Sequence, residues 1–233
     1  MSKPDAITPL SKLPNFDPRR IPVISVDTHL PAVAASSLMP DSLRQRFIQP
    51  PVWEPELLVE RKFADRPPMN ASVLIPIVMR DVPTVLLTQR TAHLSTHSGQ
   101  IAFPGGKQDE LDTDLFVTAL RETEEEVGLA RDFVQVLGSL PVYVTGTAFI
   151  ISPVVGLIRP GFTLYPNADE VADVFEVPLA FLMDPANHRR HAFEWEGVRR
   201  EWLSMPYQDD ATERFIWGAT AGMLRNFYRF LSA

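Results

Sequence analysis

Residues 99–129 place a tight Gly-Gly turn, at Gly105 and Gly106, before a segment with helical periodicity. At about 100° per residue, the glutamates of this segment fall within an arc of roughly 100°. They are Glu122, Glu125 and Glu126. The neighbouring arc is expected to face a core and holds Phe116, Ala119, Leu120, Thr123 and Val127. The pattern predicts a helix that is anchored by one face and gathers negative charge on another.

The acidic arc is a candidate metal site. Carboxylates at positions i and i+4 of a helix repel each other, and Glu122 and Glu126 have this spacing. A bound cation would remove the repulsion, and a ligand set made only of hard oxygen atoms suits Mg²⁺ or Mn²⁺. The competing interpretation is an acidic helix face that contacts only water.

Composition limits the class of protein. A chain of 233 residues with 45% hydrophobic residues can bury the core of one domain, or of one and a half. It has no cysteine, which excludes disulfides, thiolate nucleophiles and zinc-thiolate sites. The net charge of -7 argues against a nucleic-acid duplex as partner, and no apolar run is long enough for a membrane span. The N-terminus lacks a basic segment followed by an apolar one, so we expect a cytoplasmic protein.

Proline content divides the chain in two. Eight of the 22 prolines lie in residues 1–50, so we expect an irregular, proline-rich N-terminal arm there, with one short helix near residues 42–47. Residues 51–233 are expected to form the domain that carries the function. The sequence leaves open whether two copies of the chain form a homodimer.

Alternating runs of strand and helix residues indicate the fold class. Apolar, β-branched runs between turn residues predict strands at 72–79, 84–89, 133–143, 149–157, 171–177, 191–195 and 199–205. Three helices are expected: one capped by Asp112 or Thr113 and ended by Gly128, one over 178–183, and one over 213–231. This order predicts an α/β fold, an α/β/α sandwich on a mixed β-sheet.

The segment that begins at Gly106 resembles the Nudix box. That pattern has a glycine, five residues, a glutamate and seven residues, followed by Arg-Glu-aliphatic-any-Glu-Glu-any-Gly-aliphatic. The chain matches it at Gly106, Arg121, Glu122, Glu125, Glu126, Gly128 and Leu129. It departs twice: Asp112 replaces the first glutamate, with eight residues before Arg121, and Thr123 takes the first aliphatic position. The resemblance implies a Nudix-type sandwich and a metal-dependent hydrolase.

A second signature resembles the coenzyme A pyrophosphatase branch of the Nudix hydrolases. It comprises Leu86-Leu87-Thr88-Gln89-Arg90, then Gly99, then Phe103-Pro104-Gly105-Gly106. The one-residue lengthening after Gly106 and the run Ile216-Trp217-Gly218-Ala219-Thr220-Ala221 are also similar to that branch. One position differs, because Ser95 stands where the branch often has an arginine. If that arginine binds a substrate phosphate, its absence affects the choice of substrate and not the chemistry.

The resemblance implies metal ligands on the box helix. Glu125 and Glu126 are the expected principal ligands, and Glu122 is a further ligand or the group that takes a proton from water. The main-chain carbonyl of Gly106 is expected to complete the shell, since glycine permits close backbone approach. Arg121, four residues before Glu125, is expected to orient that carboxylate, although an ordinary i, i+4 ion pair has the same spacing.

Other expected site residues lie outside the helix. Glu170 occupies a loop before a strand, where the family often has an acid that binds metal or acts as a base; an exposed loop carboxylate is the alternative. Arg90 ends a strand and begins the loop that leads to the Gly-Gly turn, so it could bind an anionic substrate or form a surface ion pair. Lys107 is a second candidate for a phosphate contact.

The activity implied is hydrolysis of the pyrophosphate bond of a nucleoside diphosphate derivative, here coenzyme A or acyl-coenzyme A, to 3′,5′-ADP and (acyl-)4′-phosphopantetheine. Two alternatives remain: cleavage of ADP-ribose, a dinucleotide or a nucleoside triphosphate, and a non-catalytic regulator that only binds a nucleotide. A phosphate-loop kinase is excluded, because Lys107 follows Gly-Gly without the Gly-four-residues-Gly-Lys-Ser/Thr frame.

Overall fold

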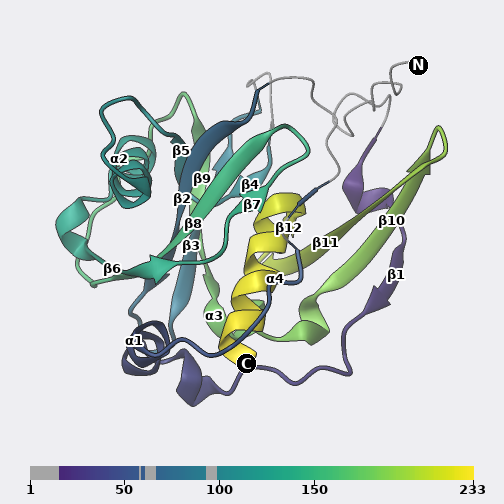
Figure 1. Ribbon diagram of the computed structural model, residues 1–233, viewed down its shortest axis with the longest axis horizontal. Coiled ribbons are helices and arrows are strands. Elements are labelled where there is room, and N and C mark those ends of the chain that lie inside the picture. Colours follow the sequence, from purple (N-terminus) through teal and green to yellow (C-terminus); the bar gives the residue numbers. More distant parts are fainter. Residues whose placement is uncertain (1–15, 58, 61–66, 93–98) are drawn as a thin grey trace.

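The chain forms two β-sheets with a buried helix between them (Figure 1). The structure, a computed structural model, describes residues 16–57, 59–60, 67–92 and 99–233. The helices are α1 (Pro40–Ile48), α2 (Leu115–Val127), α3 (Leu179–Leu182) and α4 (Gly218–Ser232). Short 3-10 helices are η2 (Pro18–Arg20), η3 (Ala35–Leu38), η4 (Arg131–Phe133) and η5 (Pro185–Asn187).

The larger sheet has eight strands and is mixed. They are β2 (Met69–Val78), β3 (Thr84–Arg90), β4 (Ile101–Ala102), β5 (Gly105–Lys107), β6 (Val134–Ser139), β7 (Tyr143–Val144), β8 (Phe149–Ile158) and β9 (Val171–Pro178). The central order is β4-β3-β2-β8-β6, with β5 on β2, β7 on β8 and β9 on β3. Only β2 and β8 run parallel among these pairs. Both are apolar and largely buried, as expected of strands covered on both faces.

The smaller sheet is antiparallel, with the order β1-β10-β11-β12. Its strands are β1 (Val23–Val26), β10 (Arg189–Trp195), β11 (Val198–Asp209) and β12 (Thr212–Trp217). The expected hairpin around Glu196 and Gly197 is present as β10 and β11. The left-handed φ of 71° at Gly197 and of 50° at Glu196 gives the tight turn.

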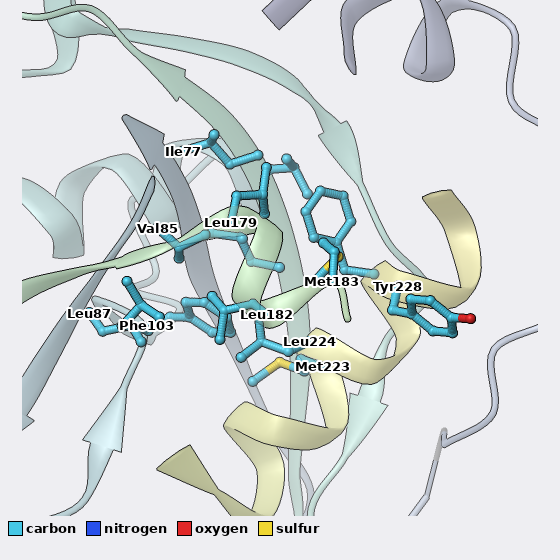
Figure 2. Close-up of a cluster of buried hydrophobic side chains, with 14 of the residues drawn as sticks. Ile77, Val85, Leu87, Phe103, Leu179, Leu182, Met183, Met223, Leu224 and Tyr228 are labelled. Atoms are coloured by element: carbon cyan, nitrogen blue, oxygen red, sulfur yellow. The ribbon is translucent and has the colours of Figure 1, made fainter. Parts of the chain in front are cut away.

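Helices cover both faces of the larger sheet. On one face, Leu74, Leu86 and Val154 form a core with Ala119 and Val127 of α2. The opposite face meets α3 and α4: Figure 2 shows Val85 and Leu87 of β3 in one cluster with Leu179 and Leu182 of α3 and Met223 and Leu224 of α4. Leu203, Met205 and Ile216 of the smaller sheet close the same core over α4. The predicted α/β/α sandwich on a mixed sheet is confirmed.

The ends of the box helix differ partly from expectation. Gly128 ends α2 in a left-handed conformation, with φ 69°, as expected. The N-cap is Asp114 and not Asp112 or Thr113, because the Asp114 carboxylate accepts hydrogen bonds from the backbone N–H groups of Phe116 and Val117. The sequence contains several N-cap candidates in a row, and backbone geometry selects among them. The Asp112 carboxylate instead pairs with Arg121.

The expected helix over 213–231 was wrong in its first turn. Residues Thr212–Trp217 form β12, which pairs with β11 so that Trp217 faces Ser204 and Phe215 faces Pro206. Helix α4 begins only at Gly218, whose φ of 63° breaks the strand. A pairing partner that lies several residues away overrides local helical periodicity here. The expected strand over 133–143 is two strands, β6 and β7, with Pro141 between them.

The described part of the predicted arm, residues 16–50, contains regular elements. Helix α1 agrees with the expected short helix, and β1 extends the smaller sheet by pairing with β10. A buried ionic network also ties the segment to the fold: Arg190 and Arg225 each pair with both Asp27 and Glu56. Burial raises the pKa of Asp27, but the hydrogen bonds and charge of Arg190 outweigh it and hold that pKa below its usual value. The division at residue 50 stays a prediction.

His188 is a neutral member of this network. Its ring is fully buried, Nδ1 lies 3.1 Å from Nη1 of Arg225, and Nε2 lies 2.8 Å from the carbonyl of Leu182. Since a guanidinium only donates, Nδ1 accepts and the ring proton is on Nε2. Burial, with the Arg225 charge, lowers the pKa of His188 to about 4.

Acidification from pH 7 should therefore destabilise the protein through His188. The unfolded ring takes up a proton near pH 6.5 and the folded ring only near pH 4, so stability is lost as the pH falls through this window. A shift of this size corresponds to about 3 kcal/mol. We expect His188→Gln, whose amide can keep both hydrogen bonds, to lack this loss in urea unfolding at pH 7.0, 5.5 and 4.5. Equal losses in the two proteins would assign the pH dependence to other groups.

Candidate active site

The Gly-Gly turn lies directly against α2. Gly105 has a φ of 153°, and a side chain there would collide with the Ser72 carbonyl and with Val73 of β2. At Gly106, a side chain would occupy the position of the Glu122 carboxylate. Backbone atoms therefore exclude a side chain at Gly105, whereas a side chain at Gly106 would displace the Glu122 carboxylate, which lies next to the backbone there as expected.

Glu126 is the buried acid of the site. Only 6% of the residue is exposed, and its Oε2 accepts a hydrogen bond of 3.0 Å from the Gly105 N–H. Its Oε1 lies 3.9 Å from Nη1 of Arg90. Burial raises the pKa of Glu126 to about 7, and the nearby charges of Glu170 and Glu122 add to the shift. The sequence placed Glu126 on an acidic arc but did not indicate that it is buried.

Glu122 is half-buried beside it. Burial raises the pKa of Glu122, and the charges of Glu125 and Glu170 raise it further, against the hydrogen bond from Arg121. Neighbouring carboxylate charges thus raise the pKa of both Glu122 and Glu126, and a bound cation would relieve this repulsion. The donors are all hard oxygen atoms, so the residues fit the Mg²⁺ or Mn²⁺ that the sequence predicts.

Arg121 uses all five of its N–H donors. Nε and Nη2 donate to the two carboxylate oxygens of Asp112, at 2.9 and 2.7 Å, and Nη2 also donates to the Lys107 carbonyl at 3.1 Å. Nη1 donates to Glu122 and to Glu125, each at 2.9 Å. The expected orientation of Glu125 by Arg121 is thus present, and Glu122 is held by the same group.

Asp112 is the main partner of Arg121, a role that we did not predict from the sequence. Its buried carboxylate pairs bidentately with Arg121, and this hydrogen bonding holds the pKa of Asp112 well below its usual value. An aspartate in place of the family glutamate, with one more residue before Arg121, still reaches the guanidinium. The signal was its position as the first acid of the box.

Glu125 and Glu170 are the exposed acids. The Glu125 side chain is 61% exposed and contacts Arg121. Glu170 lies in the turn before β9, where the backbone N–H of Asn167 donates to the Glu126 carbonyl and that of Thr91 donates to the Glu170 carbonyl. The turn is thereby fixed to the end of α2 and to the end of β3. The charge of Glu170 raises the pKa of both Glu122 and Glu126, so Glu170 belongs to the same site.

The predicted substrate contacts differ in placement. Arg90 ends β3 beside Glu126, and its buried Nε atom has no hydrogen-bond partner among the described residues. Lys107 is exposed at the end of β5 and lines an open pocket with Asn70 and Gln108. Ser95 lies outside the described residues.

The carboxylates do not form a closed cage. Over the described ranges, no three histidine, aspartate or glutamate side chains converge tightly enough to hold an ion as they stand. Arg121 occupies one oxygen each of Glu122 and Glu125, but a carboxylate has about four lone-pair positions. The second oxygens of both groups can serve a cation without loss of the arginine contacts.

Comparison with known proteins agrees with this geometry. The model of the NUDIX domain matches residues 68–206, more than half of the chain. The chain belongs to the Nudix hydrolase family. It is 44% identical over 157 residues to the uncharacterized Nudix hydrolase NudL of Escherichia fergusonii, a match that covers 67% of this chain and 79% of the relative. The NudL of Yersinia pestis strain Pestoides F is 40% identical over 163 residues, with 70% and 80% covered.

Two solved Nudix structures are more distant. A binary complex of the Caenorhabditis elegans Ap4A hydrolase has a TM-score of 0.41 and 18% identity, with 51% of this chain and 85% of that chain covered. The NUDIX domain of Shewanella oneidensis NrtR, complexed with ADP-ribose, has a TM-score of 0.39 and 22% identity, with 49% and 75% covered.

Family membership sets the reaction class. The protein is a Nudix pyrophosphohydrolase, which cleaves a pyrophosphate bond in a nucleotide derivative. Nudix hydrolases generally use divalent ions such as Mg²⁺ or Mn²⁺. Among the described helices, none has the length and apolar character needed to cross a bilayer.

Replacing Glu126 should separate activity from stability. Glu126→Gln keeps an acceptor for the Gly105 N–H but removes a charge, so we expect turnover to fall by several orders of magnitude. The folded carboxylate has its pKa near 7, above the unfolded value of 4.5, so wild type loses stability as the pH rises through that window. In chelator at pH 8, we expect the variant to be more stable by up to about 3 kcal/mol in urea unfolding.

Glu170→Gln is the comparison for this experiment. Its side chain is exposed, so the substitution should lower turnover with almost no change in unfolding free energy. Near-normal turnover in Glu126→Gln would remove it from the proposed ligands, and a Glu126→Gln protein that is less stable at pH 8 would contradict the raised pKa.

Proposed function

We propose that the enzyme hydrolyses coenzyme A or acyl-coenzyme A to 3′,5′-ADP and (acyl-)4′-phosphopantetheine. The observation that carries this proposal is the upstream signature, and the position of Arg90 supports binding of the diphosphate. The residue belongs to the upstream signature that resembles the coenzyme A branch, and its guanidinium lies beside Glu126, where Nε has no hydrogen-bond partner in the described part of the chain. An unpaired buried donor is costly, so a substrate phosphate oxygen is a favourable acceptor.

The proposed ligands for Mg²⁺ or Mn²⁺ are Glu122, Glu125, Glu126 and the carbonyl of Gly106. A bound divalent ion would neutralise the diphosphate and lower the pKa of a water molecule. The protein contributes the arrangement: Arg121 orients Glu122 and Glu125, and the Gly105 N–H orients Glu126.

The bond changes follow from this arrangement. The water oxygen forms a bond to one phosphorus, the P–O bond to the bridging oxygen breaks, and that oxygen leaves on the other phosphate. Either Glu170 or Glu122 takes the proton of the water, because both are near the other acids and each has an accessible carboxylate. Arg90 holds the diphosphate in line.

The 3′-phosphate of coenzyme A offers a way to test whether coenzyme A is the substrate. Coenzyme A carries a 3′-phosphate that ADP-ribose and common dinucleotides lack. Along the described border of the site, Arg121 is fully used by carboxylates and a carbonyl, so Arg90 and Lys107 are the cations left for phosphates. We therefore propose only weak discrimination against 3′-dephospho-coenzyme A. The cytoplasmic location stays an expectation from the sequence, and whether the chain forms a homodimer stays open.

A panel of nucleotides tests the proposed substrate. With Mg²⁺, mass analysis should detect 3′,5′-ADP and 4′-phosphopantetheine from coenzyme A, and 3′-dephospho-coenzyme A should be cleaved with a similar kcat/KM. ADP-ribose, dinucleotides and nucleoside triphosphates should be cleaved more slowly. Rapid cleavage of one of these with no coenzyme A cleavage would overturn the branch assignment and leave the Nudix chemistry intact.

Arg90→Ala should lower kcat/KM by the same factor for every diphosphate substrate. Because Arg90 lies at Glu126, we expect it to contact the diphosphate and not the 3′-phosphate. Loss of a charged hydrogen bond predicts a decrease of about 10- to 100-fold in kcat/KM for both coenzyme A and its dephospho form. Arg90→Lys, which keeps the charge, should recover part of the loss. A larger effect on coenzyme A would instead assign Arg90 to the 3′-phosphate.

A further inference from the structure

Thr118 lies in the middle of the stripe of α2 that carries the site. At about 100° per residue, Thr118, Arg121, Glu122 and Glu125 fall within an arc of roughly 100°. Thr118 is fully buried, so it can contact neither substrate nor water. Its hydroxyl lies 3.0 Å from Oδ2 of Asp112.

The single proton of the Thr118 hydroxyl can be donated to one of two acceptors, of which the Asp112 carboxylate is the first. The other is the Asp114 carbonyl, at 3.2 Å, which already accepts the backbone N–H of Thr118. The Asp112 carboxylate is closer and charged, and hydrogen bonds to charged acceptors are about twice as strong as neutral ones. The proton therefore belongs on the bond to Asp112.

This bond completes the surroundings of Asp112. Oδ1 accepts from Nε of Arg121, and Oδ2 accepts from Nη2 of Arg121, from the Asp109 N–H and from Thr118. Four donors therefore surround this carboxylate, and three of them share Oδ2. Asp112 stands in a loop, and Thr118 is the one side chain of α2 besides Arg121 that is hydrogen-bonded to it within the described residues.

We propose that Thr118 is a positioning residue that acts through Asp112 and Arg121 on Glu122 and Glu125. This chain has an aspartate in place of the longer glutamate and one more residue before Arg121. The hydrogen bond from the Thr118 hydroxyl fixes the position of the Asp112 carboxylate in this arrangement. With Asp112 fixed, the plane of the Arg121 guanidinium is fixed, and with it the two carboxylates that share Nη1. The inference rests on the proposed function only for its activity readout.

The test compares three substitutions in the full-length protein. Thr118→Val keeps the shape and removes the hydroxyl, and Thr118→Ser keeps the hydroxyl. The matched control is Thr123→Val: Thr123 is also buried, and its hydroxyl donates to the Ala119 carbonyl at 2.7 Å and to nothing at the site. Removing an outer hydrogen-bond partner of metal ligands typically costs 10- to 100-fold in metal affinity or activity.

We expect Thr118→Val to lose about 10-fold in kcat and in Mn²⁺ affinity measured by calorimetry without substrate, with KM little changed. Thr118→Ser should recover both quantities, and Thr123→Val should match wild type. In the Asp112→Asn background, Thr118→Val should have almost no further effect, because the hydroxyl acts through Asp112. Equal results for Thr118→Val and Thr123→Val, or no recovery with serine, would overturn the proposal.

A third readout needs neither metal nor substrate. The Nε–H proton of Arg121 should shift or broaden in ¹H–¹⁵N spectra of Thr118→Val and stay in place in Thr123→Val. An enzyme that cleaves no substrate on the panel, but shows these spectral and Mn²⁺ effects, would refute the proposed function and leave the role of Thr118 standing. An unchanged Arg121 signal in Thr118→Val would refute that role.

Discussion

The Arg121 guanidinium joins three parts of the molecule that the chain brings together separately. Its five donors reach the loop before α2 through Asp112, strand β5 through the Lys107 carbonyl, and the surface of α2 through Glu122 and Glu125. A planar, always charged group with a rigid fork can hold such a set in one geometry, and a lysine cannot. The spacing between the Gly-Gly turn and the acidic helix therefore depends on this side chain.

A second network of ion pairs, away from the site, also connects separate parts of the chain. Arg190 and Arg225 link β10 and α4 to Asp27 and Glu56, so the segment before residue 60 is fixed by paired charges as well as by the pairing of β1. Removing one member would leave two largely buried charges with one partner each in place of two, which costs more than the loss of a surface ion pair. The N-terminal segment is thus packed against the last helix of the chain.

Local periodicity made α2, the β2–β3 pair and the β10–β11 hairpin predictable, because each depends on neighbours a few residues apart. Strands β1 and β12 depend on partners that only the folded chain supplies, and the 213–231 helix was wrong for that reason. In the site, the motif indicated the acids and Arg121. It did not indicate the burial of Glu126 or the hydroxyl on Asp112, since both follow from how the Gly-Gly turn and the loop pack on α2.

The charges of the site explain why nucleotide and cation belong together. Asp112, Glu122, Glu125, Glu126 and Glu170 face only Arg121 and Arg90 among the described residues that interact directly with them, a net charge of -3 with all groups ionised. A diphosphate adds more negative charge, so it is repelled until positive charge is added. Burial raises the pKa of Glu126, and the unbalanced charges of Glu170 and Glu122 raise it further. These carboxylates would hold a bound divalent ion, and its positive charge would let the site accept a diphosphate.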